Sequence, residues 1–545
     1  MSFSSLWSHS LSRKNRRVIW ALLFVIALVP RAWYISATDS TNLVNQDPMC
    51  RINIANAWMV EDQYPRTMVW PPLHMVLLAL PSYLSGHVPY EKIDKGISVE
   101  DGGRALTAVL GSLLVVFIFE WALLFLPWQG AFASALTMAF WPLSVYLGSI
   151  TLAEVPFMAF LFAALLALIR YRQSPQLRWI YVAAVLFNCA SLIRFEGWLF
   201  ATTLPLILVL PMMGWKPSSS GKTHLLLLWL FNSLAPFYSL AKSAQLHGGD
   251  MLRALTINQL ETEAEAVVFA KTIGLQSQLS KIIANALMPN YSWFGLLILV
   301  GLIWHLRQRK FMALLLLVCI PALPKYWSVL SFAIPSDPRY LFTSTCLLWP
   351  LGFFLIGLRK RAPHDGDPPP WRTGPFGLSL AVPLVLVGYS LWRLPQEAHY
   401  RAEKGFSSSF KEAASLVRQL RLPHEAVLGE ISHSDHCGFA VLAGIPAELF
   451  RMPPPPTYFN QERWQKVSVD SILALSHESL RWIVVDPKGE VLPKAVVSPE
   501  FHEKLATYGL NARQIYPHPS LSADDLNSFS VYLVLEKDKS PRVDD

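Results

Sequence analysis

The sequence is poor in charge and in cysteine for its length. Of its 545 residues, only 15% are Asp, Glu, Lys or Arg, against about 25% in soluble globular chains, and 53% are hydrophobic. This composition excludes a single soluble domain and argues against a disordered or nucleic-acid-binding chain. The five cysteines form no CxxC pair, so their spacing predicts neither a zinc ribbon nor a disulfide framework. A bridge between Cys50 and Cys437 stays open, because both fall on one side of the topology predicted below.

The chain also lacks the common catalytic signatures. It has no Gly-x-Ser-x-Gly, no His-Glu-x-x-His and no Walker A sequence. The segment 218–223 resembles only the end of a Walker A, because no glycine precedes it at the required spacing. His433, His436 and Cys437 lie close together in sequence, but no second ligand cluster accompanies them, so a polar loop is favoured over a zinc site.

What the chain has instead is a series of hydrophobic segments, each near the length of about 20 residues that a bilayer core requires. The first of them has no signal-peptide cleavage site, so we interpret it as an uncleaved span. The shorter segment 69–84 is flanked by prolines and predicts an interfacial helix. We expect eleven membrane spans, at residues 18–35, 105–127, 130–149, 153–170, 179–196, 198–213, 223–240, 291–306, 311–332, 340–358 and 375–393.

Basic residues gather in alternate loops of this arrangement. The formal net charge of +8 is modest, and in a membrane protein such an excess reports topology. By the positive-inside rule the N-terminus is cytoplasmic, and eleven spans then place the C-terminus outside. The basic residues on the predicted cytoplasmic side include Arg13, Lys14, Arg16, Arg17, Arg170, Arg172, Arg178, Lys216, Lys222, Arg307, Arg309, Lys310, Arg359, Lys360, Arg361 and Arg372.

The composition changes after residue 393. Residues 394–545 contain no hydrophobic run of membrane length. Alternating hydrophobic residues predict strands at 427–431, 482–485 and 531–535, and amphipathic patterns predict helices at 410–420 and 501–510. We therefore expect a polytopic α-helical membrane domain over residues 1–393, with outer loops at 36–104 and 241–290, followed by an extracytoplasmic α/β domain over 394–545.

Ionisable residues near the outer ends of the spans are the candidates for chemistry, because charge at membrane depth is costly and marks functional sites. Two acids stand at such positions, Asp47 before Pro48 and Glu154 at the start of the fourth span. The other candidates are Arg194 with Glu196 in a tight outer turn, Lys325, and the pair Arg339–Tyr340.

Each of these residues also has a simpler interpretation. Asp47 is a common turn former before proline, and an acid at a helix N-terminus, such as Glu154, is favoured by the helix dipole. Arg194 and Glu196 would form an internal ion pair that fixes their turn. Arg339 and Tyr340 are typical of an interfacial anchor.

Taken together, the candidates combine two carboxylates with up to three cations on one side of the membrane. A carboxylate acts as a general base toward a hydroxyl, and a cation holds a phosphate and stabilises it as a leaving group. The combination favours transfer from a lipid-phosphate donor to a hydroxyl acceptor outside the membrane.

The order of these features resembles the GT-C membrane glycosyltransferases, in particular the protein O-mannosyltransferase and aminoarabinose-transferase-like group (family 39-like). The resemblance covers roughly residues 18–360. It consists of an acid in the first outer loop (Asp47), a Pro-Pro-Leu-aromatic segment (70–74), an acid opening the fourth span (Glu154), and an Arg-Tyr pair opening a late span. Many relatives have Asp-Glu in the first loop, whereas Asp47 is followed by Pro48, so a metal held by such a pair is unsupported here.

The resemblance implies a polyprenyl-phosphate-linked sugar as donor and inversion at the anomeric carbon. Asp47 would be the general base and Glu154 would orient the acceptor or a phosphate-binding cation. No cofactor is required, because phosphate is a good leaving group. Arg339 is the first choice for holding the donor phosphate, with Arg194, Lys325 and Tyr340 as further candidates. Trp70 and His74 would line the sugar or acceptor pocket, with simple packing as their alternative.

Two other functions remain open from the residues alone. A secondary transporter would also have many spans and few charges, but it would show repeated halves and charges near the midplane. A non-catalytic assembly protein of an envelope polysaccharide system would not depend on Asp47. The acceptor is a lipid, a protein or a polysaccharide, and no nucleic acid is expected. Short loops favour a bacterial inner membrane with a periplasmic active site, and an endoplasmic-reticulum membrane with a luminal site gives the same charge pattern.

Overall fold

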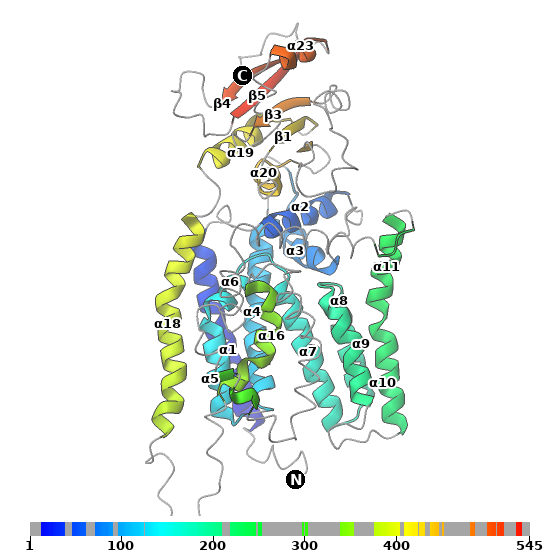
Figure 1. Ribbon diagram of the computed structural model, residues 1–545, viewed down its shortest axis with the longest axis vertical. Helices are drawn as coiled ribbons and strands as arrows, with labels where there is room; N and C mark the ends of the chain where they lie inside the picture. The colour runs from blue at the N-terminus through cyan, green and yellow to red at the C-terminus, as the bar shows by residue number, and fades with distance from the viewer. Residues whose placement is uncertain are drawn as a thin grey trace, which may run out of the picture. The chain divides into compact units, whose positions relative to one another are not determined.

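The protein is described by a computed structural model in two units (Figure 1). The helical unit contains residues 1–37, 66–74 and 104–398, and the mixed unit contains residues 38–65, 75–103 and 399–545. Segments of the first predicted outer loop thus group with the C-terminal part of the chain. The structure describes residues 12–38, 46–61, 71–90, 96–124, 126–209, 219–246, 249–252, 297–298, 300–303, 338–353, 375–403, 408–422, 424–430, 436–445, 450–451, 480–485, 499–507, 510–516 and 530–536.

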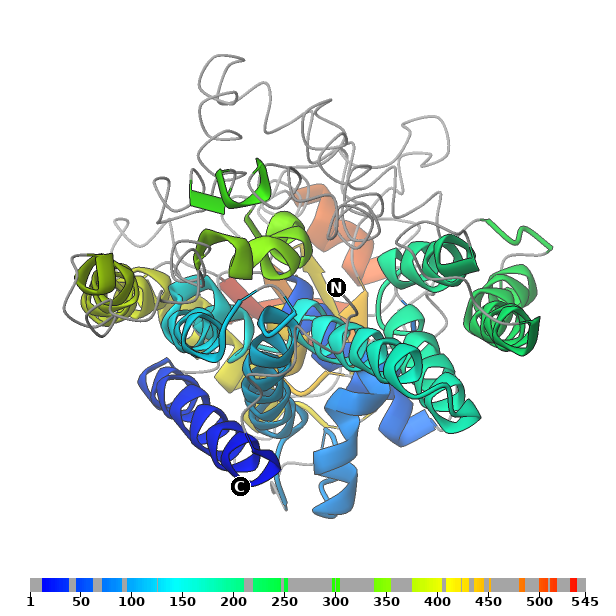
Figure 2. The same ribbon diagram turned by 90° about the horizontal axis from the view of Figure 1, so that it is seen from below.

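The described part of the helical unit consists of helices that lie side by side (Figures 1 and 2). Two of its helices cross the boundary between the units, since α4 begins and α18 ends in the mixed unit. The helices are α1 (Arg13–Ala37), α4 (Val99–Ala122), α5 (Trp128–Phe140), α6 (Pro142–Leu147), α7 (Glu154–Gln173), α8 (Leu177–Ser191), α9 (Glu196–Val209), α10 (Ser219–Asn232), α11 (Leu234–Leu246), α16 (Pro338–Leu348), the 3-10 helix η3 (Trp349–Phe353) and α18 (Pro375–Glu403).

Among the described residues, four helical segments are long and apolar enough to cross a membrane. They are Arg13–Ala37, Val99–Ala122, Glu154–Tyr171 and Ser220–Gln245, and they coincide with four of the eleven expected spans. Shorter apolar helices are Leu73–Leu84, Leu177–Ser191 and Phe342–Phe353. The expected span at 311–332 and most of the one at 291–306 lie outside the described residues.

The segment 130–149, expected to be one span, is two helices. α5 ends at Phe140, Trp141 has extended backbone angles (φ −57°, ψ 122°), and α6 begins at Pro142. Proline has no N–H for the helix ladder and disfavours the α conformation in the residue before it, which explains the break. A similar break follows Leu348, where α16 gives way to the 3-10 helix η3.

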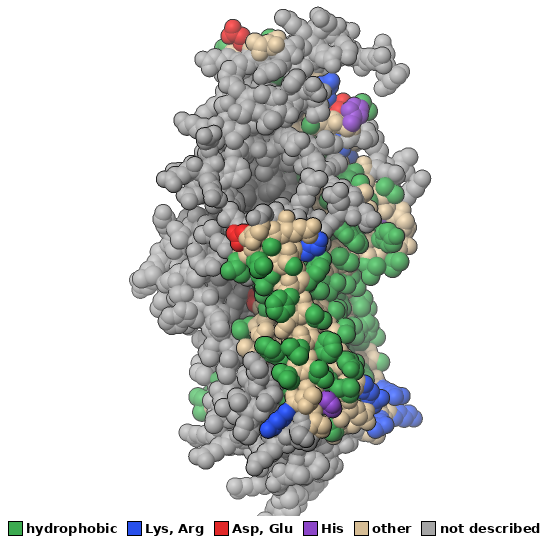
Figure 3. Space-filling model, turned by 90° about the vertical axis from the view of Figure 1, so that its right-hand side faces the viewer, with side chains coloured by type: hydrophobic (Ala, Val, Ile, Leu, Met, Phe, Trp, Pro, Cys, Tyr) green, Lys and Arg blue, Asp and Glu red, His purple; other side chains and the backbone are tan. Residues whose placement is uncertain are grey.

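The helices alternate in direction, so their basic ends meet. The start of α1 contacts the end of α4 through Arg16 and Glu120, and the end of α7 contacts the start of α10, where Tyr171 Oη lies 3.0 Å from His224 Nδ1. We call this the basic end of the helical unit. Figure 3 shows hydrophobic side chains covering the face of this unit that contains α10 and α11, with Lys and Arg toward its ends. The exposed side chains on these two helices include Leu226, Leu230, Phe231, Leu234, Phe237 and Tyr238.

The described part of the mixed unit has one five-stranded sheet of order β2-β1-β3-β5-β4. β2, β1 and β3 run parallel, whereas β5 runs antiparallel to both β3 and β4. β1, β3 and β5 lie on the three segments where strands were expected. The strands are β1 (Ala426–Glu430), β2 (Phe450–Arg451), β3 (Leu480–Val485), β4 (Leu510–Tyr516) and β5 (Ser530–Glu536), and the helices are α2 (Gln46–Glu61), α3 (Leu73–Leu84), which begins in the helical unit, α19 (Ser408–Leu420), α20 (His436–Leu442) and α23 (Pro499–Thr507).

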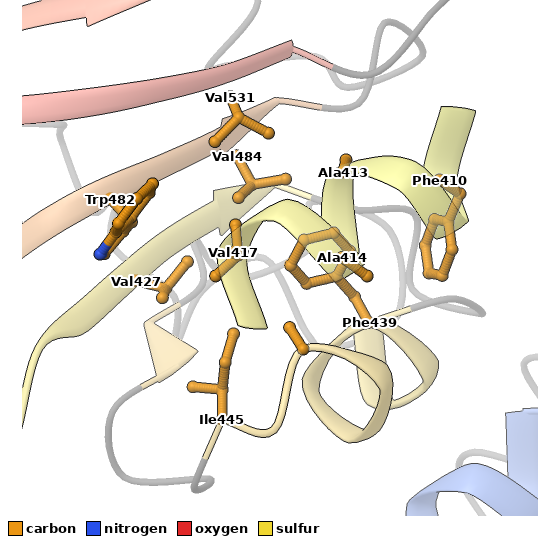
Figure 4. Packing of buried hydrophobic residues seen from close by; sticks show 11 residues of the cluster. Phe410, Ala413, Ala414, Val417, Val427, Phe439, Ile445, Trp482, Val484 and Val531 are labelled. Carbon is orange, nitrogen blue, oxygen red and sulfur yellow. The ribbon is translucent and has the colours of Figure 1, made fainter. Parts of the chain in front are cut away.

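The core of the mixed unit lies between the sheet and two helices, as Figure 4 shows. Its buried side chains come from α19, α20 and the strands β1, β3 and β5: Phe410, Ala413, Ala414, Val417, Val427, Phe439, Ala443, Ile445, Trp482, Val484 and Val531. Beside this core, Arg421 is buried. Burial lowers the pKa of its guanidinium, and the negative charge of Glu425 acts in the opposite direction without reversing the shift. Its guanidinium donates to three backbone carbonyls, of Leu422, Glu425 and Gly444, so it joins α19 to the turn after α20.

One further contact ties the first loop to this unit. α2 packs against α20, and Cys50 on α2 is disulfide-bonded. Cys189 and Cys346 are free thiols. Since Cys437 lies on α20, this packing favours the bridge that the sequence left open.

Candidate functional site

The tight turn between α8 and α9 holds Arg194. The turn is closed by backbone hydrogen bonds from Arg194 N to Ala190 O (3.0 Å) and from Gly197 N to Arg194 O (3.0 Å). Gly197 lies against the Ser191 backbone, where an added Cβ would come within 2.7 Å of Ser191 Cα. Trp198 Nε1 also donates to Ser191 O (3.1 Å). The turn therefore holds Arg194 in one place.

All three guanidinium nitrogens of Arg194 bind carboxylates. Nε and Nη2 donate to the two oxygens of Glu196, both at 2.9 Å, and Nη1 donates to Glu154 Oε1 at 2.6 Å. The Arg194–Glu196 contact is the ion pair that the sequence offered as a simpler interpretation. The contact with Glu154 joins α7 to the α8–α9 turn. We refer to Glu154, Arg194 and Glu196 as the glutamate–arginine cluster, whose formal charge is −1.

Glu154 has a second oxygen that the cluster does not use. Its side chain is only 5% exposed. Oε2 is buried and has no hydrogen-bond partner among the residues that the structure describes. Glu154 is the first residue of α7, where the helix dipole favours a negative charge. A buried carboxylate oxygen without a partner is costly, so this atom is suited to accept a hydrogen bond from a hydroxyl or a water.

The proline-rich segment of the sequence lies beside the cluster. Leu73 N donates to Leu192 O at 2.9 Å, which places the start of α3 against the turn that holds Arg194. The helix expected over 69–84 begins at Leu73, after Pro71 and Pro72, and His74 is fully buried. Two features that were far apart in the sequence, the 71–74 segment and Arg194, are therefore neighbours.

Two buried arginines that sequence analysis did not select fix the loop leading to Glu154. Arg31 Nη2 donates to Ser144 Oγ (2.8 Å) and Nη1 donates to Ala27 O (2.7 Å) and Ala139 O (3.3 Å). Arg104 Nε donates to Ser149 O at 3.1 Å. Residues 148–153 are all buried. The signal that would have revealed Arg31 is a cation within a hydrophobic run, which is costly at membrane depth.

The remaining predicted residues are placed only in part. Asp47 is the second residue of α2, in the mixed unit, and its side chain lies outside the described residues, as do Trp70 and Lys325 entirely. Arg339 is half-buried in the first turn of α16, a helix that packs against α7. Tyr340 follows it, with no side-chain placement described. The cluster and the 71–74 segment are therefore the described part of the predicted site.

A metal site has no support from the described side chains. Among them, no three His, Cys, Asp or Glu residues are grouped as ligands. The donor set of the cluster is two carboxylates already bound by a guanidinium, which competes with any cation at the same oxygens.

Comparison with known proteins gives both a family match and a fold match. Residues 96–239, which include the whole cluster, match the family model described as dolichyl-phosphate-mannose-protein mannosyltransferase. The chain is similar to the structure of ArnT from Cupriavidus metallidurans bound to undecaprenyl phosphate, with 15% identity, a TM-score of 0.55, and coverage of 94% of this chain and 98% of that chain.

A second solved structure of similar fold is the oligosaccharyltransferase of Archaeoglobus fulgidus in complex with zinc and sulfate. The identity is 14%, the TM-score is 0.52, and the alignment covers 91% of this chain and 72% of that chain. A comparison with curated protein sequences gives no match. At these identities, the likeness to the solved structures establishes a shared fold.

Proposed function

We propose, from the place of this chain in the GT-C superfamily of membrane glycosyltransferases, that it moves a sugar from a polyprenyl-phosphate carrier to an extracytoplasmic hydroxyl acceptor. The matched family model is named for a dolichyl-phosphate-linked mannose, and the ArnT structure holds undecaprenyl phosphate. Both carriers are polyprenyl phosphates, which supports the same class of donor here.

The main observation behind the proposal is that Glu154 Oε2 is buried without a hydrogen-bond partner among the described residues. It belongs to the cluster that lies beside the 71–74 segment. The acid at the start of α7 and the proline-rich 71–74 segment are two of the features on which the GT-C resemblance rests. They lie together here, since Glu154 binds Arg194 and the 71–74 segment contacts the turn that holds Arg194. Glu154 Oε2 is buried and ready to accept a hydrogen bond. It would hold an acceptor or sugar hydroxyl in place, while Trp70 and His74 would line the pocket around it.

The proposed reaction inverts the anomeric carbon in one displacement. Asp47 takes the proton from the acceptor hydroxyl, the oxygen forms a bond to the anomeric carbon, and the bond from that carbon to the phosphate oxygen breaks. The electron pair leaves with polyprenyl phosphate. The leaving phosphate is already a stable anion, so the step needs neither a general acid nor a metal. A general base of this kind contributes about 10²–10⁴ in rate.

Cations near the leaving phosphate would stabilise its charge. Arg339 is the best candidate, because Arg194 already gives all three of its nitrogens to Glu154 and Glu196. Arg339 is half-buried on a helix that packs against α7. Lys325 and Tyr340 remain further candidates on the same side of the predicted topology. Arg194 would then act by orienting Glu154.

The disulfide of Cys50 supports an extracytoplasmic site. Structural disulfides persist in oxidising compartments such as the bacterial periplasm. Cys50 lies on α2, three residues after Asp47. The base would thus work outside the cytoplasm, as the positive-inside rule predicts for this loop, and we propose a multi-pass protein of a bacterial inner membrane with its C-terminal part in the periplasm.

The test is release of free polyprenyl phosphate by purified protein. Wild type and Asp47→Asn are each incubated with a panel of polyprenyl-phosphate sugars and a cell-envelope extract as the source of lipid, protein and polysaccharide acceptors. We expect the variant to lose about 10²–10⁴ in rate. Asp250→Asn is the matched control, because Asp250 is an exposed aspartate after α11 and belongs to no predicted site.

The possible outcomes test the proposed glycosyltransferase class and the proposed general base separately. If Asp47→Asn no longer releases polyprenyl phosphate and Asp250→Asn releases it at the full rate, both the enzyme class and the role of Asp47 are supported. Equal release by wild type and Asp47→Asn would remove Asp47 as the base and leave the transferase in place. No release by wild type from any donor of the panel would contradict the proposed donor class.

A further inference from the structure

The helical unit contains a cavity at its basic end. Its volume is about 630 Å³, which is within the usual range of ligand pockets. Residues of α1, α4, α7 and α8 line it. The charged residue that α7 contributes to the lining, Arg170, lies 16 positions after Glu154, or about 24 Å along the helix axis. The cavity is therefore separate from the glutamate–arginine cluster.

The walls of this cavity are hydrocarbon. The lining includes Phe24 of α1, Leu113, Val116 and Phe117 of α4, and Leu166 and Ile169 of α7. Val182 of α8 lines the cavity and is also 42% exposed, so the cavity opens on the outer surface of the bundle. Nearby exposed side chains on α1 and α8 are apolar too, among them Val25, Tyr181 and Val185. A surface of this kind faces lipid, so the cavity is open to acyl chains.

One end of the cavity is charged, with an excess of positive charge. Arg16 binds Glu120 through two nitrogens, with Arg16 Nε donating to Glu120 Oε1 at 2.6 Å. Trp20 Nε1 donates to the same oxygen at 2.7 Å. Glu120 is thus fully engaged. Arg170 also lines the cavity and has no ion pair or side-chain hydrogen bond to any residue within the described ranges.

Arg170 and Arg16 are close enough to interact electrostatically. The mouth contains two guanidinium groups and one carboxylate, which Arg16 binds, so its formal charge is +1. An anion beside Arg170 would balance this charge. The indoles of Trp20 and Trp179 lie in the same lining, and tryptophan is typical of the level of lipid headgroups.

We propose that this cavity binds an anionic phospholipid of the membrane leaflet at the basic end. The acyl chains fill the apolar part, and the headgroup phosphate accepts hydrogen bonds from Arg170. A phospholipid fits both halves of the cavity, since it joins long hydrocarbon to one negative charge. The proposal does not rest on the proposed transferase function, because no residue of the reaction lines the cavity.

The test measures lipid binding to the purified full-length protein by native mass spectrometry. Dioleoylphosphatidylglycerol and dioleoylphosphatidylcholine have the same chains and differ in net charge. Both headgroups contain the phosphate, but the quaternary ammonium of phosphatidylcholine cancels the phosphate charge. We therefore expect phosphatidylglycerol to bind about tenfold more tightly to the positively charged mouth. Arg170→Gln should abolish this preference, and Arg170→Lys should retain most of it. Ala163→Phe should weaken both lipids, because Ala163 lines the cavity and a larger side chain fills it.

Arg178→Gln is the matched control. Arg178 is an exposed arginine at the same end that stacks on Trp179, with its guanidinium carbon 5.2 Å from the ring centroid, and it does not line the cavity. Its substitution should leave the preference unchanged. Equal binding of the two phospholipids, or equal effects of Arg170→Gln and Arg178→Gln, would overturn the proposal. So would displacement of phosphatidylglycerol by glycerol phosphate, or a preference for undecaprenyl phosphate that depends on Arg170.

Discussion

At the end of the helical unit where α7 begins, one arginine lies between two glutamates. At the end where α7 finishes, one glutamate is bound by Arg16, and a second arginine, Arg170, has no carboxylate within the described ranges. At both ends the arginine–glutamate pairs are largely buried. The first group has one arginine for two glutamates, whereas the second has two arginines for one glutamate. The formal charge is −1 for the glutamate–arginine cluster and +1 for the mouth of the cavity.

At each end, the groups that hold the helices together are different from the group that is available to a ligand. The paired groups hold the helices, because a buried charge without a partner is expensive and a paired one is tolerated. The unpaired atom is the one available to a ligand. At the first end it is an oxygen of Glu154, suited to a hydroxyl, and at the second it is the guanidinium of Arg170, suited to a phosphate.

Removing the shared arginine is expected to have the largest effect. Arg194→Ala leaves Glu154 buried without its cation and should cost about 3–5 kcal/mol of stability. The measurement is the midpoint of thermal unfolding in detergent. Glu154→Gln is the comparison, because it keeps the two hydrogen bonds from Arg194 to Glu196 and should cost clearly less. A smaller loss in Arg194→Ala than in Glu154→Gln would contradict the view that Arg194 holds the turn.

The cluster shows how far the sequence predicts a site. Glu154 and the Arg194–Glu196 pair are visible in sequence, since charge at membrane depth is costly and the two residues of the pair are only two positions apart. The bond from Arg194 to Glu154 joins positions 40 residues apart and depends on the packing of α7 on α8. No local pattern encodes that packing, so the sequence could suggest the residues but not their partner.

The disulfide of Cys50 gives a prediction about contacts within the mixed unit. We expect Cys437 to be the partner, because α2 packs on α20. In Cys437→Ser, Cys50 should become reactive to a thiol reagent in the unreduced protein, as seen by mass spectrometry, and stability should fall by about 2–4 kcal/mol. Cys189→Ser is the control, since Cys189 is already a free thiol. An unreactive Cys50 in Cys437→Ser would show that the partner is another cysteine.

The loop that leads to Glu154 is tightly packed around Gly148. In Gly148→Ala the new Cβ would lie 2.5 Å from Arg31 Nε and 2.8 Å from Ser144 O. Ser144 O is backbone and Arg31 is held by hydrogen bonds, so neither can move freely, and we expect a loss of about 1–3 kcal/mol. Gly388→Ala is the control within α18, because nothing lies within 4 Å of an added Cβ there. Equal unfolding midpoints for the two variants would contradict the tight packing around Arg31.

Hydropathy explains what sequence analysis found and what it missed in this region. The run 130–149 is apolar throughout, so it predicts one span, although Pro142 divides it into α5 and α6. Arg31 is surrounded by apolar residues, so its unfavourable contribution is hidden when hydropathy is averaged over a window of the sequence. In the mixed unit, β4 (510–516) begins where the predicted helix 501–510 ends, and α23 stops at Thr507. Averages of hydropathy over a window locate apolar segments well, whereas the points where helices and strands begin and end depend on single residues.

The smallest effect is expected at the other end of α7. Arg170→Gln removes a half-exposed charge that has no carboxylate among the described residues, so stability without lipid should change by no more than about 0.5 kcal/mol. With phosphatidylglycerol in excess, the stabilities of wild type and Arg170→Gln should differ. A ligand that binds only the folded state raises stability by RT ln(1 + [L]/Kd), so wild type should gain about 2.7 kcal/mol at a hundredfold excess over its Kd, and the variant should gain less. The measurement is the unfolding midpoint with and without lipid. A large loss without lipid would mean that Arg170, like Arg194, is a structural cation, and the contrast between the two ends would then fail.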